Sequence, residues 1–161
     1  MAALDPGVLM PPLPLIDEQG RALRVPDDAS ETLYVAFKTT CPTCALTWPY
    51  LERLREASEG GMRVVGISQD PARETREFQQ RHGARIEIGY DPKPWPVSES
   101  LGLTTVPTFL LVGADGTIEE RFEGWDRERM RGLARRGAEL AGRDASEIFR
   151  PGEEVPATKP G

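Results

Sequence analysis

The sequence predicts an α/β domain in which helices flank a central mixed β-sheet, preceded by an N-terminal β-hairpin extension. Two apolar, β-rich runs, at 32–37 and 62–68, are each followed by a predicted helix, the first from apolar residues at helical spacing and the second from the start signal Asp70-Pro71. That alternation is typical of strands that pair in parallel. Two later runs, at 108–112 and 117–122, flank the turn Ala114-Asp115-Gly116 and predict an antiparallel pair at the edge of the same sheet.

The first 30 residues are interpreted as an extension that precedes the first central strand. Prolines at four of the first 14 positions predict an irregular start. Residues 13–16 and 22–25 then flank a polar segment at 17–20, and this pattern predicts the hairpin. We therefore expect residues 1–142 to form a single domain, with the extension at about 1–30.

Two cysteines stand where the first central strand is followed by a helix. Residues 32–37 predict a strand buried on both faces, and apolar residues then recur at helical spacing as far as Gly60-Gly61. Cys41 is therefore expected at the N-terminus of this helix, with Cys44 one turn further along.

The next elements repeat the order of strand and helix. Residues 62–68 predict a second buried strand, after which Asp70 and Pro71 are expected to cap and open a helix. Alternating apolar residues at 86–90 predict a short strand, and a proline-rich loop at 91–96 then leads into a short helix.

The last predicted element is a helix capped by Asp126. Its apolar residues form one stripe that ends at Gly142. From Arg143 onward, over residues 143–161, we expect an irregular C-terminal tail that is frayed at its end.

The composition excludes several classes of partner. The formal net charge is -6, and acidic and basic residues are mixed without a basic run that would follow a phosphate backbone, so no nucleic acid is expected. No stretch approaches the roughly 20 apolar residues of a membrane span. We expect a monomer that is cytoplasmic as the sequence is written, or periplasmic or secreted if an export signal has been removed.

The cysteine pair is interpreted as a redox-active dithiol, because so short a loop would restrict the unfolded chain little. A thiolate at a helix N-terminus is stabilised by the helix dipole, so Cys41 is expected to attack a disulfide and Cys44 to resolve the mixed disulfide. Pro42 lacks an N–H donor, and the Thr43 hydroxyl is a candidate donor in its place. Lys38 either adds positive charge near Cys41 or is simply solvated.

Two other interpretations of the cysteine pair stay open. A zinc site would need two further ligands, and the chain has no third cysteine and a single histidine, His82. An inert buried pair is less typical of the order strand, Cys-x-x-Cys, helix. Neither a glycine-rich dinucleotide turn nor a phosphate loop is present, so no cofactor and no metal are expected.

Four motifs together resemble the thioredoxin superfamily. They are Cys41-Pro42-Thr43-Cys44 after a buried strand, Pro49 five residues later, Val106-Pro107-Thr108 before a strand, and the Asp115-Gly116 turn. The resemblance is to the branch that groups cytochrome-maturation thioredoxins with redoxin (AhpC/TSA-like) domains, and it extends over about residues 13–141. It implies a thioredoxin-like fold, thiol-disulfide oxidoreductase activity, and protein or small-molecule thiols and disulfides as partners.

The resemblance also implies roles for residues outside the dithiol. The Val106-Pro107 bond is expected to be cis, with Pro107 facing the dithiol and the Val106 backbone binding a substrate strand. Pro49 is expected to bend the active-site helix without ending it. Trp95, in preference to Trp48, is a candidate for an apolar surface beside the dithiol.

Two positions depart from the family pattern. Thr40 stands where an aromatic residue usually precedes the first cysteine, and Ala36 stands where thioredoxins bury an acid. Proton transfer at the second cysteine then needs another group. The candidate acids are Glu87, Asp91 and Glu99.

The leading hypothesis is the reduction of protein disulfides through a mixed disulfide on Cys41 that Cys44 resolves. The alternative is a peroxiredoxin-like thiol peroxidase, although such enzymes carry a threonine three residues before the reactive cysteine, where this chain has Lys38. A third possibility is a non-enzymatic binding module in which the cysteines are idle.

Overall fold

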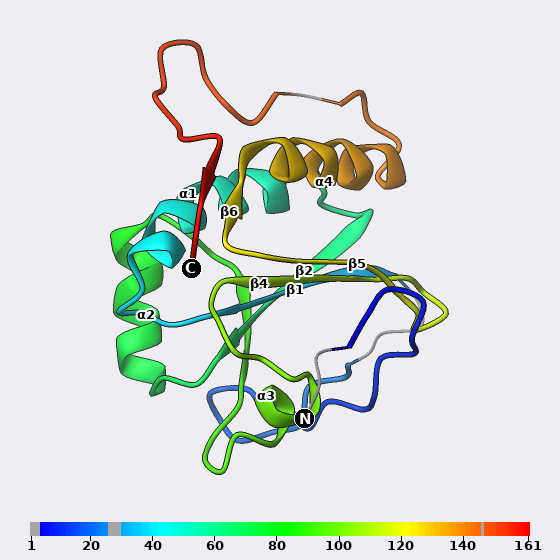
Figure 1. The fold of residues 1–161 in the computed structure, drawn as a ribbon, viewed down its shortest axis with the longest axis vertical. Coiled ribbons are helices and arrows are strands. Elements are labelled where there is room, and N and C mark those ends of the chain that lie inside the picture. Colours follow the sequence, from blue (N-terminus) through cyan, green and yellow to red (C-terminus); the bar gives the residue numbers. More distant parts are fainter. Residues whose placement is uncertain (1–3, 26–29, 146) are drawn as a thin grey trace.

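The computed structural model describes residues 4–25, 30–145 and 147–161, and its core is a five-stranded sheet flanked by helices (Figure 1). The strand order is β3-β2-β1-β4-β5, in which β1, β2 and β3 are parallel and β4 and β5 are antiparallel to their neighbours. These strands are β1 (Glu31–Phe37), β2 (Met62–Ser68), β3 (Glu87–Tyr90), β4 (Thr108–Val112) and β5 (Ile118–Glu123). The helices are α1 (Pro42–Ala57), α2 (Ala72–Arg81), α3 (Pro96–Ser100) and α4 (Arg127–Leu140), and a second, two-stranded sheet pairs β6 (Trp125–Asp126) with β7 (Thr158–Lys159). The predicted α/β class with a central mixed sheet is confirmed.

Strand β1 lies in the middle of the sheet because its apolar run suits burial on both faces. All seven of its residues are buried. Leu33 and Phe37 belong to the core on one side of the sheet, whereas Tyr34 and Ala36 belong to the core on the other. A strand covered on both sides needs this nearly continuous apolar sequence.

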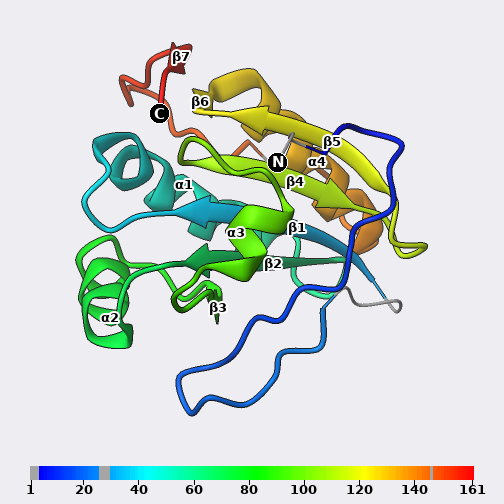
Figure 2. The same cartoon turned by 60° about the horizontal axis from the view of Figure 1, so that its bottom comes forward.

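Each face of the sheet is covered by a different set of elements. On the Phe37 side, α1 and α4 pack Cys44, Trp48 and Leu133 against the strands. On the opposite side, Val97 of α3 and the N-terminal segment cover the sheet, and α3 lies in front of β1 and β2 in Figure 2. The cysteine-bearing helix is thus fixed directly on the central strand.

The N-terminal extension turns back on itself as a short hairpin, in which the N–H of Asp17 donates to the Arg21 carbonyl at 2.8 Å and the N–H of Leu23 donates to the Leu15 carbonyl at 2.9 Å. Ile16 makes one bridge with Ala22 and another with Tyr90 of β3. The Ile16 N–H donates to the Tyr90 carbonyl at 3.2 Å, and the Tyr90 N–H donates to the Ile16 carbonyl at 2.8 Å. Backbone groups of successive residues in an extended strand point to opposite sides, so Ile16 pairs with the edge of the main sheet while Leu15 and Asp17 pair with the returning arm.

Helix α1 continues through Pro49, as predicted.

Helix α2 begins differently from the prediction, because it has no side-chain capping bond at its N-terminus. The carboxylate of Asp70, predicted to be this cap, instead accepts a hydrogen bond of 2.8 Å from the N–H of Thr39. The prediction of an Asp70 cap is therefore wrong, since its side chain is engaged by the loop that precedes the cysteines.

The described part of the segment after Arg143, residues 144–145 and 147–161, is irregular over most of its length, but its end is paired as a strand and is not frayed, contrary to expectation. Ile148 and Phe149 are buried in the core. Glu153 accepts two hydrogen bonds, of 2.7 and 2.8 Å, from the guanidinium of Arg53 on α1. Further on, β7 adds to the edge of β6 (Figure 1). Residues 147–161 keep these positions because Ile148 and Phe149 are buried in the core and β7 pairs with the edge of β6.

Candidate active site

Cys41 is the N-cap residue of α1, and its thiol faces two backbone groups. Its Sγ accepts a hydrogen bond of 3.2 Å from the N–H of Cys44. Its thiol donates toward the carbonyl oxygen of Val106 over 3.6 Å. The side chain is partly exposed. A thiolate at this position is stabilised by the helix N-terminus and remains accessible to a disulfide.

Cys44 lies one turn further along α1 and is fully buried. Burial is the main cause that raises the pKa of its thiol well above the usual range, and the hydrogen bond with Cys41 raises that pKa further. The two thiols therefore differ in environment. The first is placed to meet a substrate, and the second is held protonated in the core beside it.

The Val106-Pro107 peptide bond is cis, as predicted. Pro107 is buried, and its carbonyl accepts a hydrogen bond of 2.8 Å from the N–H of Gly124, immediately before β6. The adjacent Val106 carbonyl is the group that faces Cys41. The loop before β4 is thus brought against the start of α1, as the sequence motifs indicate.

The hydroxyl of Thr43 does not supply the donor to Cys41 that the sequence suggests. Its Oγ1 donates instead to the carbonyl of Pro160, at 2.7 Å. Thr43 is only 3% exposed, because residues near the C-terminal end of the described chain cover it. Pro42, in contrast, is exposed at the first position of the helix.

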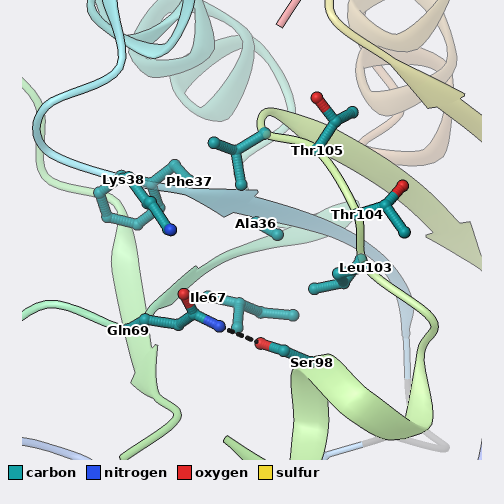
Figure 3. Close-up of a pocket in the computed structure, with 10 residues that line it drawn as sticks. Ala36, Phe37, Lys38, Ile67, Gln69, Ser98, Leu103, Thr104 and Thr105 are labelled. Carbon is teal, nitrogen blue, oxygen red and sulfur yellow. Dashed lines mark hydrogen bonds between the residues drawn. The ribbon is translucent and has the colours of Figure 1, made fainter.

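Lys38 and Thr40 are both exposed in the loop between β1 and the dithiol. The carbonyl of Lys38 accepts a hydrogen bond of 3.2 Å from the N–H of Cys41. The Lys38 side chain lines a cavity of about 170 Å³ that Val106 also borders. In Figure 3 the side chains of Lys38, Gln69 and Ser98 converge on this cavity. Lys38 is therefore at the site, but its charge is directed toward the cavity.

In the described part of the chain, no contact joins the candidate acids from the sequence to the cysteines. Glu87 forms an ion pair of 2.7 Å with Arg63, and Glu99 is exposed on α3. Asp91 is fully buried and accepts hydrogen bonds from the first turn of α3, including one of 2.6 Å from the Ser98 hydroxyl. These contacts assign Asp91 to holding α3 in place.

Asp70 is the acid that sequence reasoning missed. Its carboxylate holds the Thr39 N–H at 2.8 Å, and its negative charge makes a minor contribution to the raised pKa of Cys44. The sequence did carry a signal, because Asp70 follows β2 closely. The carboxyl ends of parallel neighbouring strands meet at one edge of a sheet, which brings this residue to the loop after β1.

Trp48 and Trp95, the two tryptophans considered as candidates beside the dithiol, occupy contrasting positions. Trp48 is fully buried, and its indole N–H donates to Gln79 at 2.8 Å. Trp95 is 38% exposed on the loop before α3, with Lys93 Nζ 5.5 Å from the centre of its ring. Among the contacts of the described residues, none joins Trp95 to the dithiol. An apolar role for Trp95 beside the cysteines remains a prediction.

The fold and this site define a thioredoxin-like thiol-disulfide oxidoreductase. More particularly, the chain belongs to the Redoxin family, whose model matches residues 6–135. No curated protein sequence matches the chain.

Several solved structures share the fold. A structure described as the thiol:disulfide interchange protein DsbE of Chlorobium tepidum is 20% identical, with a TM-score of 0.74, and the match covers 87% of this chain and 100% of that one. The thioredoxin domain of a thiol-disulfide oxidoreductase from Bacteroides vulgatus is 22% identical, with a TM-score of 0.67 and coverage of 74% and 89%. A secreted disulfide oxidoreductase of Mycobacterium tuberculosis is 15% identical, with a TM-score of 0.65 and coverage of 74% and 92%.

Proposed function

We propose that this protein reduces protein disulfides by way of a mixed disulfide on Cys41. The observation that carries the proposal is the asymmetry of the two thiols. Cys41 is partly exposed at the N-terminus of α1 and faces the Val106 carbonyl at 3.6 Å, whereas Cys44 is buried one turn behind it. The Cys41 thiol can react with a substrate disulfide, and the Cys44 thiol is placed to attack the resulting mixed disulfide.

The first step is an attack by the Cys41 thiolate on one sulfur of the substrate disulfide. A sulfur-sulfur bond forms between Cys41 and the substrate, and the substrate disulfide breaks. The departing substrate sulfur leaves as a thiolate and takes a proton from water. The N–H of Cys44, 3.2 Å from the Cys41 Sγ, stabilises the attacking thiolate before this step.

The second step releases the substrate. Cys44 gives up its proton and attacks the Sγ of Cys41, a Cys41-Cys44 bond forms and the mixed disulfide breaks, and the departing substrate sulfur takes up the proton to leave as the second free thiol. The protein has then given two electrons and holds a Cys41-Cys44 disulfide. An external dithiol must reduce it before another cycle, because these residues supply no further electrons.

The substrate side of the site is proposed to be a backbone surface beside Val106. An extended segment that carries the disulfide would pair with that carbonyl while its sulfur reaches Cys41. Residues that flank a disulfide in a partly unfolded protein suit such a site, because their backbone groups are free.

The decisive experiment combines a reduction potential with a turnover assay. A potential near about -270 mV, that of thioredoxin, would support the reducing direction, whereas one near or above about -180 mV would support an oxidant or isomerase. Insulin reduction that disappears in the Cys41→Ser variant is the expected result. Absence of any reversible disulfide would overturn the proposal. Rapid thiol-dependent consumption of hydrogen peroxide would favour the peroxidase alternative instead.

The compartment is a separate part of the proposal. None of the helices among the described residues is long and apolar enough to cross a membrane. The fold is shared with a M. tuberculosis protein described as secreted, which supports the secreted or periplasmic alternative over the cytoplasm. Fractionation of the source cells, with detection of the native chain, tests this choice.

A further inference from the structure

The region of the chain around β7 lies directly beside the dithiol. Strand β7 pairs with β6, with Lys159 opposite Trp125 and Thr158 opposite Asp126. The next residue, Pro160, accepts the 2.7 Å hydrogen bond from the Thr43 hydroxyl, between the two cysteines. The path is visible in Figures 1 and 2, where the chain runs from β7 toward the start of α1.

Gly161 then packs against the loop that faces Cys41. A Cβ added to Gly161 would lie 2.2 Å from the carbonyl oxygen of Val106, too close for any side chain. The same carbonyl oxygen lies 3.6 Å from the Sγ of Cys41. Residues 157–161 therefore occupy the backbone surface that the proposed function assigns to a substrate strand.

A second close approach fixes the position of this strand. A Cβ on Gly124 would lie 2.7 Å from the carbonyl oxygen of Lys159, so the backbones meet at van der Waals distance. The N–H of Gly124 is itself bonded to Pro107 at 2.8 Å. Gly124 therefore contacts both the backbone of β7, at Lys159, and the cis-proline loop, at Pro107.

The chain is anchored by side chains before this strand, whereas the strand itself is held mainly through its backbone. Phe149 is buried, the Glu153 carboxylate is paired with Arg53, and the indole N–H of Trp125 donates to the Pro156 carbonyl at 2.8 Å. All of residues 156–161 are exposed on their outer side. Residues 157–161 are held by the two-residue ladder of β6 and β7, by the N–H of Arg127, which donates to the Ala157 carbonyl at 2.9 Å, and by the Thr43 hydroxyl. An incoming strand offers the same backbone groups, so it can replace these bonds while the anchor stays in place.

We propose that residues 157–161 act as a tethered competitor in the substrate groove. The partner that fits the groove is an extended segment of a disulfide-bearing protein, which pairs with the edge of β6 and the Val106 carbonyl in place of β7. This inference rests on the proposed function of the dithiol and adds to it the place and the kind of substrate. A small disulfide that needs only the exposed side of Cys41 has no strand to displace.

The test compares the full chain with a form that ends at Pro156, which keeps the anchor. Removal of residues 157–161 is expected to raise kcat/KM for insulin reduction about fivefold, about the net contribution of one hydrogen bond, since a substrate strand replaces most of the bonds that this segment makes. Turnover of a small aromatic disulfide is expected to change less than about twofold. A synthetic peptide of residues 155–161 added to the shortened form should restore inhibition, competitively with insulin, whereas a scrambled peptide should not.

A point variant tests the same idea without shortening the chain. In Gly161→Val the new side chain has no room against Val106, so the strand is pushed out of the groove and insulin turnover should rise as it does in the shortened form. Glu154→Val, at an exposed position before the strand, is the matched control and should leave turnover unchanged.

The outcomes separate this inference from the function on which it rests. Insulin turnover that is equal in the full chain, the shortened form and Gly161→Val would overturn the tethered competitor and leave the reductase intact. If shortening the chain raised the turnover of insulin and of the small disulfide equally, the tethered competitor would also be overturned, since residues 157–161 would then not act by excluding a substrate strand. If no form reduces any disulfide, the proposed function itself fails and the inference falls with it.

Discussion

The Sγ of Cys41 lies 3.6 Å from the carbonyl oxygen of Val106, although 65 positions separate the two residues in the chain. The contact joins the start of α1 to the loop before β4, and both elements flank the central strand β1. An extended segment bound along the Val106 backbone would therefore lie beside the Cys41 thiol.

Replacement of Cys44 by serine should trap the reaction halfway. Cys41 keeps its place at the helix N-terminus and still attacks, but serine cannot displace the substrate sulfur. We expect a stable mixed disulfide with an insulin chain, detected by non-reducing electrophoresis and mass spectrometry. The matched variant Cys41→Ser should form none, and equal trapping by both variants would contradict the assigned roles.

The stability of the reduced protein should fall at alkaline pH because of Cys44. Burial raises the pKa of this thiol in the folded state, whereas an unfolded cysteine ionises near 8.5. Above that value the unfolded state binds fewer protons than the folded state. The free energy of unfolding should then decrease by up to about 1.4 kcal/mol per pH unit.

Urea unfolding of the reduced protein between about pH 8 and pH 10 measures this slope. Below the unfolded pKa the contribution of the Cys44 thiol is fully present, so the curve should be flat there with respect to this group. The Cys44→Ala variant should lack the alkaline slope. An identical slope in both proteins would exclude Cys44 as its origin.

Asp70→Asn should lower the pKa of the Cys44 thiol. The negative charge of Asp70 is one of the groups that raise that pKa, and asparagine removes the charge while keeping an oxygen that accepts the Thr39 N–H. The pH dependence of mixed-disulfide resolution, followed by rapid mixing, should shift toward lower pH. Glu74→Gln, which removes an exposed charge from the first turn of α2, is the control and should not shift it.

Glu119 should make the stability depend on pH near neutrality. Its hydrogen bond with Glu31, aided by partial burial and by the charge of Glu31, raises the pKa of Glu119 to about 7. A raised folded pKa means that its stabilising contribution is present below the unfolded value of about 4.3 and is lost as pH rises toward 7. Thermal unfolding of Glu119→Gln should lack this decline, while Glu120→Gln should retain it.

The local elements were predictable because their causes lie within short segments. The apolar run of β1 needs burial on both faces, and this pattern is readable without any neighbour. The Cys-x-x-Cys pair at the start of a helical pattern likewise placed Cys41 at an N-cap, which the structure confirms. The cis bond before Pro107 was correctly expected from the family motif rather than from local physical chemistry.

Other features depended on which distant groups compete for the same atoms. Asp70 has the local sequence of a helix cap, but its carboxylate is taken by Thr39. Thr43 has a hydroxyl next to the reactive cysteine in the sequence, but that hydroxyl donates its hydrogen bond to the carbonyl of Pro160. In both cases the alternative partner lies at least 31 positions away in the chain, so no local pattern reveals it.

The order of the five central strands and the four helices, the dithiol and its position at a helix N-terminus could be read from the sequence, because they follow from periodicity and short spacing. The groups that face the dithiol could not be read from it, and neither could strands β6 and β7. The pairing of β6 with β7 carries a segment that looked irregular to the side of Thr43 and Val106. Backbone pairing of this kind uses groups that every residue has, so it leaves little trace in the sequence and becomes visible only when the chain is folded.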